Sequence, residues 1–256
     1  MKRGMTRIGI FGVTGRMGRA IGEAASAQGA TVAGGLDREG RAHGGPATAA
    51  ALAEASDVLV DFTAPDALAG HLDLALAAGK PILIGTTGLT PPHHQRIREA
   101  ARRIAVLQTA NTSIGINVLR YLVREAARRL GPDWDAEIVE MHHRHKLDTP
   151  SGTALLLGAA VNQGRGAASD DALNRFDRMQ DGPHEREEGG VYYASLRGGS
   201  VAGDHEVIFA GEGERIELGH RAETRAVFAT GAVRAALWLT GKPAGLYTMQ
   251  DVLGLD

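Results

Sequence analysis

The stretch RIGIFGVTGRMG, residues 7–18, decides the fold of this chain. Its first five residues form a short apolar run with β-branched side chains, which predicts a strand. A turn with three glycines follows directly, and residues 19–28 then place small apolar side chains on one helical face. The predicted order is strand, glycine-rich turn and helix, which is how a doubly wound α/β sheet begins.

The glycines of this turn suit a backbone that binds a phosphate group. Gly12 permits a tight turn out of the strand, Gly15 lets the backbone approach a pyrophosphate, and Gly18 lets the helix lie close to the sheet. The pyrophosphate would lie on the helix N-terminus, where free N–H groups and the dipole favour negative charge. The spacing is G-x-x-G-x-x-G rather than G-x-G-x-x-G, and an ordinary turn in a chain with 35 glycines gives the same pattern.

The second predicted strand, residues 31–36, ends at a pair of charged residues. Asp37 follows Gly18 at about the distance of the acid that binds the adenosine ribose in dinucleotide folds. Arg38 is suited to a 2′-phosphate, because a guanidinium group pairs with phosphate bidentately. The pair indicates that both NADH and NADPH are accepted; an ordinary surface Asp-Arg pair is the alternative.

Strands and helices continue to alternate up to residue 107. Strands are expected over residues 57–62, 81–84 and 104–107, and helices over residues 65–78 and 91–103. This alternation predicts a parallel sheet that binds its ligands at the carboxyl ends of the strands. Residues 85–87 and 109–112 follow such ends, and their small or hydroxyl side chains suit a ribose and a nicotinamide. Simple turn chemistry is the alternative.

The pattern changes after Asn111, with a long amphipathic helix over residues 115–130 and a strand over residues 136–142. The segment EMHHRHKLDTPSGTA, residues 140–154, then places five basic or titratable residues, 142–146, just before a helix over residues 154–162. Ser151 is a natural N-cap, and the bare helix start could bind a carboxylate, with Lys146 as a point charge and a histidine as proton source. A solvated basic loop, a mere helix cap and a histidine metal site are the alternatives, but no recognised ligand spacing favours metal.

The composition limits the classes of function. The chain has 256 residues, of which 43% are hydrophobic and 23% charged, so it can bury a real core. Its net charge of −2 disfavours a nucleic-acid partner, and any anion must be held by a local basic cluster. It has no cysteine, which excludes disulfides and thiolate metal sites. No run of apolar residues approaches the length of a membrane span, so we expect a soluble cytoplasmic protein.

The segment 140–154 resembles the signature of the 4-hydroxy-tetrahydrodipicolinate (dihydrodipicolinate) reductase family, roughly E-x-H-H-x-x-K-x-D-x-P-S-G-T-A, with every fixed position filled. The resemblance also covers residues 10–18, 61–63, 84–88, 111–117, 228–239 and 245–253, and so spans nearly the whole chain. It implies an N-terminal Rossmann domain with a parallel sheet, and a second α+β domain with a mixed sheet that binds substrate and forms a homotetramer. The implied boundaries are residues 1–113 with 221–256 for the first domain and 114–220 for the second. Domain closure implies hinges near residues 112–115 and 219–224.

The resemblance also implies an activity, the reduction of hydroxy-tetrahydrodipicolinate to tetrahydrodipicolinate by NADH or NADPH. His142 matches the catalytic acid and Lys146 the second proton donor or substrate lysine. The substrate, a small cyclic dicarboxylate, is matched by His143, Ser151, Gly152 and Thr153. The matched cofactor contacts are Gly12, Val13, Thr14, Gly15, Arg16, Met17, Asp37, Arg38, Gly85, Thr86, Thr87, Thr109, Ala110, Asn111 and Thr112.

Two positions depart from the family pattern. Thr112 stands where the family often has phenylalanine, and Asp37 is shorter than the usual glutamate, which leaves the cofactor preference open. Two other functions compete with the reductase: a regulator that senses NAD(P) without catalysis, and an enzyme of related architecture that acts on another di-acid or imine. A sensor has no need of His142, Lys146 and the cap at Ser151 together.

Overall fold

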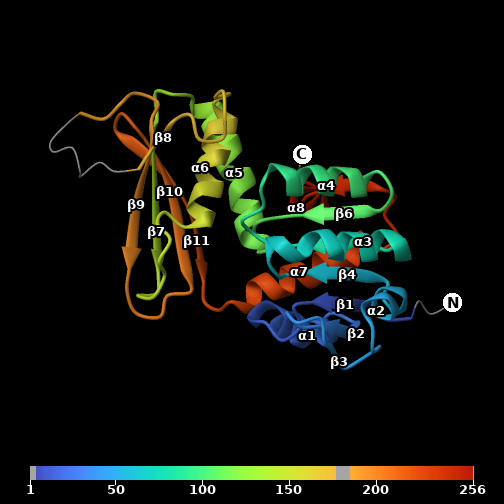
Figure 1. Cartoon of the computed structure of the whole chain (residues 1–256). Coiled ribbons are helices and arrows are strands. Elements are labelled where there is room, and N and C mark those ends of the chain that lie inside the picture. The colour runs from blue at the N-terminus through green and yellow to red at the C-terminus, as the bar shows by residue number, and fades with distance from the viewer. Residues whose placement is uncertain (1–3, 177–184, 256) are drawn as a thin grey trace. The chain divides into compact units, whose positions relative to one another are not determined.

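The computed structural model describes residues 4–176 and 185–255, which fold into two compact units. Unit 1 comprises residues 1–114 and 226–256, and unit 2 comprises residues 115–225 (Figure 1). The chain therefore enters unit 2 once and returns to unit 1 once. These crossings lie beside the predicted boundaries at residues 113 and 220.

Unit 1 is built on a seven-stranded sheet. All its strand pairs are parallel except the outermost pair, β2 with β3, which is antiparallel. In sheet order the strands are β12 (Gly245–Tyr247), β6 (Ala105–Gln108), β5 (Ile82–Ile84), β4 (Val58–Asp61), β1 (Thr6–Phe11), β2 (Ala30–Leu36) and β3 (Ala42–His43). Because these neighbouring strands are parallel, their carboxyl ends lie along one edge of the sheet.

Helices cover both faces of this sheet, as the apolar strands require. One core contains side chains of α1 (Arg16–Ala27), α7 (Ala226–Leu239) and α8 (Met249–Leu253). The other contains those of α2 (Ala49–Ala55), α3 (Leu68–Ala78) and α4 (Pro91–Ala101). A short 3-10 turn, η1 (Pro65–Ala67), precedes α3. The last helices therefore complete a domain that the first residues of the chain begin.

Unit 2 is a mixed five-stranded sheet with helices on one face (Figure 1). In sheet order its strands are β11 (Glu214–Ala222), β10 (Gly203–Gly211), β7 (Asp135–His142), β9 (Val191–Arg197) and β8 (Asn174–Arg175). The central strand β7 is antiparallel to β10 and parallel to β9. Helices α5 (Ile114–Leu130) and α6 (Gly152–Gly164) bury their apolar faces against it.

The predicted fold class, a parallel Rossmann-like sheet followed by a second domain with a mixed sheet, is confirmed. Several element bounds differ from the prediction. Helix α1 begins at Arg16 rather than at residue 19, and α6 begins at Gly152 rather than at residue 154. The segment after α6 contributes the short strand β8, and residues 177–184 lie outside the described part of the chain. Within residues 4–176 and 185–255, no helix is long and apolar enough to cross a membrane.

Candidate functional site

The glycine-rich turn of unit 1 leaves its backbone open to a ligand. Gly12 has φ of +84°, and a Cβ there would lie 2.9 Å from the carbonyl oxygen of Phe62. Gly18 packs against this turn rather than against the sheet, since its Cβ would lie 2.2 Å from the carbonyl oxygen of Gly12. The N-cap of α1 is Gly15, and no described side chain caps the helix. Its first N–H groups are therefore available to an anion, so the turn fits the pyrophosphate of a dinucleotide.

The other predicted cofactor residues follow neighbouring strands along the same sheet edge. Hydrogen bonds join consecutive strand ends: Gly12 N–H and Val13 N–H donate to the carbonyl of Leu36, and Thr109 N–H donates to that of Ile84. Gly85 must lack a side chain, because a Cβ would lie 2.2 Å from the Phe62 ring. The segments 12–17, 37–38, 85–87 and 109–112 are thus brought to one edge, as the order of the parallel strands requires.

Asp37, the predicted ribose ligand, is already engaged by its own loop. Its Oδ1 accepts from the N–H groups of Glu39 and Arg41 at 3.0 and 2.8 Å, and its Oδ2 lies 2.9 Å from His43 Nε2. The hydrogen bond with His43 holds the pKa of Asp37 below its usual value. Arg38 beside it is exposed. The loop thus presents a charged carboxylate and a guanidinium side by side.

A buried carboxylate orders the loops that follow β4 and β5. Asp61 is fully buried and accepts from the hydroxyls of Thr63 and Thr86, at 2.6 and 2.9 Å, while Oδ2 lies 2.8 Å from His71 Nδ1. The Thr86 hydroxyl is therefore committed inside the protein, and Thr87 next to it is exposed. Of these two predicted contacts, Thr86 can offer only its backbone without breaking the cluster.

Residues 109–112 form a self-contained turn after β6. The Thr109 hydroxyl donates to the carbonyl of Asn111 at 2.8 Å, and Asn111 Oδ1 accepts from Ser113 N–H at 2.8 Å. Thr112 is buried, and its hydroxyl donates to the Phe228 carbonyl of α7 at 2.7 Å. Thr112, where the family often has phenylalanine, thus anchors this turn to α7 by a hydrogen bond. Ala110 is exposed at the tip of the turn.

In unit 2, the buried face of β7 changes from apolar to polar along the strand. Ala136 and Ile138 belong to the core, while Glu140 and His142 continue the same face and are also buried. His142 Nδ1 lies 2.5 Å from Glu140 Oε2. Arg197, at the end of β9, pairs in register with His142 and donates to both carboxylate oxygens of Glu140 at 2.8 Å. An imidazole held this way is a well-placed proton donor.

Burial raises the pKa of Glu140, but hydrogen bonds from Arg197, Ser195 and His142 outweigh this effect and leave the pKa below its usual value. The carboxylate also accepts from the N–H of Ser151 at 3.2 Å. Glu140 is therefore an ionised group that joins β7, β9 and the start of α6.

Ser151 caps α6 as predicted, because its Oγ accepts from Ala154 N–H at 3.2 Å. The same oxygen lies 3.0 Å from Nε2 of His205, a buried residue of β10. The rings of His205 and His142 meet edge to face at 5.0 Å. Burial, and then the neighbouring His142, lower the pKa of His205 to about 4, so it is neutral at physiological pH. At Gly152, no described atom lies within 4 Å of the place of a Cβ, which leaves room at the helix start.

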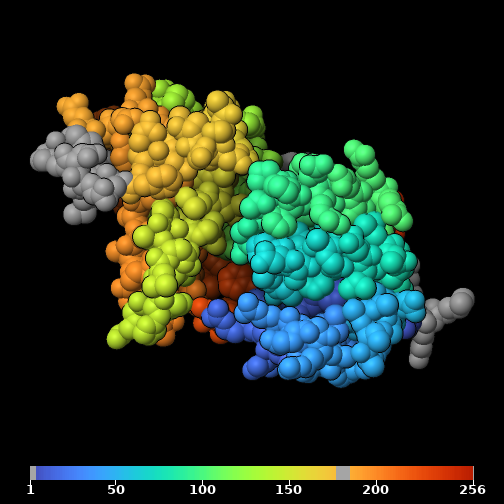
Figure 2. Space-filling view, in the orientation of Figure 1, coloured from blue at the N-terminus to red at the C-terminus, as the bar shows by residue number. Residues whose placement is uncertain are grey.

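The basic loop 143–150 lies at the surface of unit 2 (Figure 2). Lys146 Nζ pairs with Asp148 Oδ2 at 2.8 Å, and Lys146 N–H donates to the His143 carbonyl. His143 Nε2 lies 3.0 Å from Arg225, and burial together with that guanidinium lowers the pKa of His143. A cavity of about 650 Å³ is lined by His143, Arg144, His145, Gly199, Ser200, Ala202 and Arg225. A cationic pocket of this kind suits an anionic ligand.

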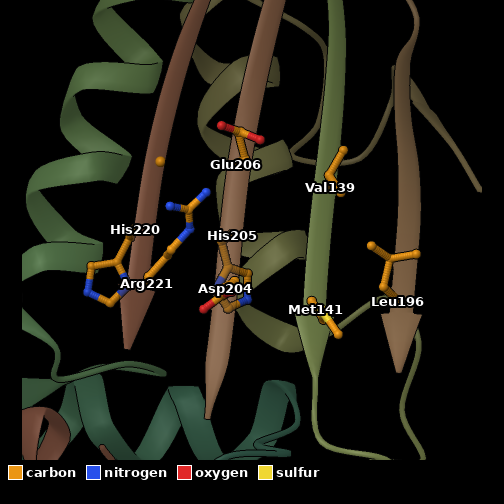
Figure 3. A pocket seen from close by; sticks show the side chains of 9 residues that line it. Val139, Met141, Leu196, Asp204, His205, Glu206, His220 and Arg221 are labelled. Atoms are coloured by element: carbon orange, nitrogen blue, oxygen red, sulfur yellow. The ribbon is translucent and has the colours of Figure 1, made fainter. Parts of the chain in front are cut away.

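A second cavity of unit 2, of about 350 Å³, opens on the face of the sheet away from α5 and α6. Figure 3 shows Val139 and Met141 of β7 beside Leu196 of β9, with the carboxylates of Asp204 and Glu206 on β10. Apolar side chains therefore remain accessible on this face: Leu196 is 51% exposed. It is a different surface from the one that holds Glu140.

Four residues of the second unit, Glu140, Arg197, His205 and Arg225, had no role predicted from the sequence. Glu140 could have been found, because strand periodicity puts residues 140 and 142 on one face. Arg197, His205 and Arg225 come from distant parts of the chain, and only the register of β7 with β9 and β10 brings the first two to Glu140 and His142. Among the described residues, no group of three His, Asp or Glu side chains is placed to hold a metal ion.

Comparisons with known proteins cover both units. The model of the dihydrodipicolinate reductase N-terminus matches residues 6–112, and that of the C-terminus matches residues 115–253. The 4-hydroxy-tetrahydrodipicolinate reductase of Zymomonas mobilis is 56% identical over 256 residues, covering 99% of both chains. The enzyme of the same name from Acidiphilium cryptum is 47% identical and covers 97% of this chain and 98% of its own.

A solved structure has the same fold. Dihydrodipicolinate reductase from Paenisporosarcina sp. TG-14, bound to dipicolinate, is 23% identical, with a TM-score of 0.76 over 96% of this chain and 98% of its own. The family models thus match both halves of the sequence, and the solved structure shares the fold. The chain belongs to the dihydrodipicolinate reductase family.

Proposed function

We propose that this protein catalyses the reduction of 4-hydroxy-tetrahydrodipicolinate to tetrahydrodipicolinate by NADH or NADPH, in lysine and diaminopimelate biosynthesis. The family models that cover both units and the relatives at 47–56% identity support this activity. The observation that carries it in this chain is the buried His142, held by Glu140 beside the start of α6. We also place the enzyme in the cytoplasm, with the rest of that biosynthesis.

The carboxyl edge of the sheet in unit 1 is the proposed cofactor site. The bare N-terminus of α1 would bind the pyrophosphate, and Asp37 with Arg38 would hold the adenosine ribose and any 2′-phosphate. The backbone of residues 85–87 and 109–112 would contact the nicotinamide end. The bound cofactor supplies a hydride.

The buried polar face of unit 2 is the proposed site for the di-acid and its proton. Gly152 and Thr153 at the start of α6 would bind one carboxylate through backbone and hydroxyl groups, and Ser151 holds that helix start in place. Lys146 and His143 would supply positive charge to the ring that accepts the hydride. His142 would donate the proton that completes the reduction.

Turnover of freshly generated substrate tests the assignment, with NADPH oxidation followed by absorbance. Wild-type protein should consume NADPH, whereas His142→Gln should lower kcat by about 100-fold or more, because a general acid contributes about 10²–10⁴-fold. A matched control is His94→Gln, which lies in α4 outside the predicted contacts and should stay within about twofold. NADPH binding without turnover in the wild type would instead favour a sensor. Faster turnover of acyclic imino acids would favour a related enzyme with another substrate.

Lys146→Ala separates substrate binding from cofactor binding. The change removes a cation from the proposed di-acid site and should lower turnover by several orders of magnitude. Dipicolinate, the ligand of the Paenisporosarcina enzyme, is a stable probe whose affinity should fall in parallel. NADPH affinity should not change, because its proposed contacts lie in unit 1. An equal loss of NADPH affinity would contradict this division of roles.

We further propose that the protein is a homotetramer joined through unit 2. The accessible apolar side chains on the open face of the sheet support this, including Met141 and Leu196, which is 51% exposed. An oligomer would bury them, and light scattering should give four times the chain mass of 26.8 kDa. A monomer mass at micromolar concentration would contradict the proposal.

A further inference from the structure

The Glu140 carboxylate is surrounded by hydrogen-bond donors. Oε1 accepts from Arg197 at 2.8 Å and from Ser151 N–H at 3.2 Å, while Oε2 accepts from Arg197 at 2.8 Å and lies 2.5 Å from His142 Nδ1. An ionised carboxylate can only accept hydrogen bonds. Nδ1 of His142 must therefore carry a hydrogen, whether the imidazole is neutral or charged. This leaves Nε2 as the nitrogen that gains and loses a proton.

The backbone of β10 leaves space beside that nitrogen. A Cβ on Gly203 would stand 3.0 Å from His142 Nε2, so a side chain there would crowd it. The opposite side of the ring is fixed by Glu140, which is itself only 1% exposed. The geometry thus gives the two ring nitrogens different roles: one is anchored and the other is free to meet a ligand.

We propose that Glu140, oriented by Arg197, is a positioning residue for His142: it holds Nδ1–H so that Nε2 faces and protonates the substrate ring. The proposal rests on the reductase function proposed above. It assigns Glu140 no contact with substrate, and its effect acts through the orientation, tautomer and charge of His142. Asp-His pairs orient catalytic imidazoles in other enzymes by the same physics.

The proposed proton transfer needs no reactant besides the hydride donor and a proton from solvent. When the conjugated imine accepts a hydride, negative charge develops on the ring. The Nε2–H bond of the imidazolium breaks as a bond forms between that hydrogen and the ring. His142 is left neutral, with Nδ1–H still donated to Glu140, and a solvent proton restores the imidazolium. A carboxylate that keeps its own charge throughout stabilises the imidazolium form by its field.

Other titratable groups also lie around His142. His205 of β10 meets its ring, and His220 of β11 and Lys146 act on His205. His143 follows it in the basic loop and is influenced by it. With Arg197, these groups are cationic or neutral, so Glu140 is the anion in hydrogen-bond contact with the ring among the described residues.

The first test needs no variant. Heteronuclear NMR of wild-type protein with isotope-labelled histidine distinguishes the two neutral tautomers of His142, and His142→Gln identifies the signal. When its ring is neutral, His142 should be the tautomer protonated at Nδ1. Protonation at Nε2 instead would overturn the proposal. This readout does not depend on turnover, so it separates failure of the proposal from failure of the reductase function.

The second test is Glu140→Gln, which keeps the shape and removes the charge. We expect kcat to fall about 10- to 100-fold, part of the contribution of a general acid, while the KM for NADPH stays within about twofold. The basic limb of the pH profile of kcat should move to lower pH, because a neutral amide stabilises the imidazolium less. Glu137→Gln, on the same strand and paired with Arg186, is the matched control and should change neither. An unchanged kcat and pH profile in Glu140→Gln would overturn the proposal; if that variant does not fold, the tautomer decides.

Discussion

The Asp37 side chain has three hydrogen-bond partners within its own loop. The pKa of its carboxyl is lowered first by His43, so the group stays charged at neutral pH and opposes a nearby phosphate. Arg38 is the adjacent side chain that could offset this charge. At the scale of single residues, the balance between NADH and NADPH therefore depends on one loop that carries opposite charges.

Arg38→Ala should weaken NADPH more than NADH. A charge-assisted hydrogen bond contributes about 1.5–3 kcal/mol, so the Kd of NADPH should rise roughly 10- to 100-fold, while that of NADH changes about twofold or less. Fluorescence titration with each cofactor measures the two constants. Arg41→Ala, in the same loop, controls for a general loss of positive field. An equal effect on both cofactors, or a larger effect from Arg41→Ala, would remove Arg38 as the phosphate ligand.

Residue types alone indicated the chemistry proposed for the second site but not the hydrogen-bond partners of its residues. His142, Lys146 and Ser151 stand together in the sequence, so a common role was proposed for them from the sequence alone. Arg197 could not be predicted, because it reaches Glu140 only through the parallel register of β7 with β9. The partner of Asp37 was missed for a similar reason, since His43 belongs to a two-residue strand with little sequence signal.

At the scale of elements, the contact between α1 and the turn before it forms the proposed phosphate site. Gly18 lies in the first turn of this helix, where a Cβ would stand 2.2 Å from the Gly12 carbonyl oxygen and 2.6 Å from Val13 Cα. Backbone atoms cannot move aside as a flexible side chain can. Gly22, one turn later, has no described atom within 4 Å of the place of a Cβ.

Gly18→Ala and Gly22→Ala should therefore have opposite effects. We expect Gly18→Ala to lower the free energy of unfolding by about 1–3 kcal/mol and to weaken NADPH binding, because the helix start must shift. Gly22→Ala should raise it by about 0.5–1 kcal/mol and leave binding unchanged, since alanine favours the helix. Chemical denaturation and cofactor titration measure both. A stable, tightly binding Gly18→Ala would show that the close approach is not needed.

The sequence predicted those elements whose pattern is strong over their own length. The buried runs of β1, β4, β5 and β6 and the long helix α5 belong to this class. Residues 203–222, by contrast, were not assigned as the long hairpin β10–β11, because β11 is mostly exposed and its pattern does not reveal a core face. The small helix α2 was also missed, although Thr48 caps it.

At the scale of the whole molecule, the buried His205 links stability to pH. Its pKa is lowered to about 4 in the folded protein, chiefly by burial, against about 6.5 when unfolded. Above pH 6.5 the imidazole is neutral in both states, so its burial does not lower the free energy of unfolding. As pH falls from about 6.5 to about 4, only the unfolded state binds the proton, so the free energy of unfolding decreases.

Replacement of His205 should flatten this dependence. Between about pH 7.5 and pH 5, the wild type should lose roughly 2 kcal/mol of unfolding free energy through this group, at 1.36 kcal/mol per pKa unit. His205→Gln cannot titrate and should lose that much less over the same range, as urea denaturation at the two pH values measures. His94→Gln provides the control. Identical pH dependence in His205→Gln and wild type would refute the linkage.

The family resemblance implied crossings between the units near residues 113 and 220, and the structure has them after residues 114 and 225. Composition and periodicity alone would not have returned residues 226–256 to the first unit. That return requires α7 to pack on β4, β5 and β6, a tertiary contact between segments more than a hundred residues apart. Long-range contacts of this kind have no local signature.

Within eight residues, one face of strand β7 carries first core side chains and then Glu140 and His142 of the proposed site. Deleting or inserting a single residue ahead of Ile138 would turn that face outward, exposing Ile138 and taking Glu140 and His142 out of the buried site together. Damage to folding and damage to chemistry are therefore inseparable in this strand. Natural variation in its length should be far rarer than in the surface loops, and a mutational scan would need abundance and turnover measured side by side to interpret it.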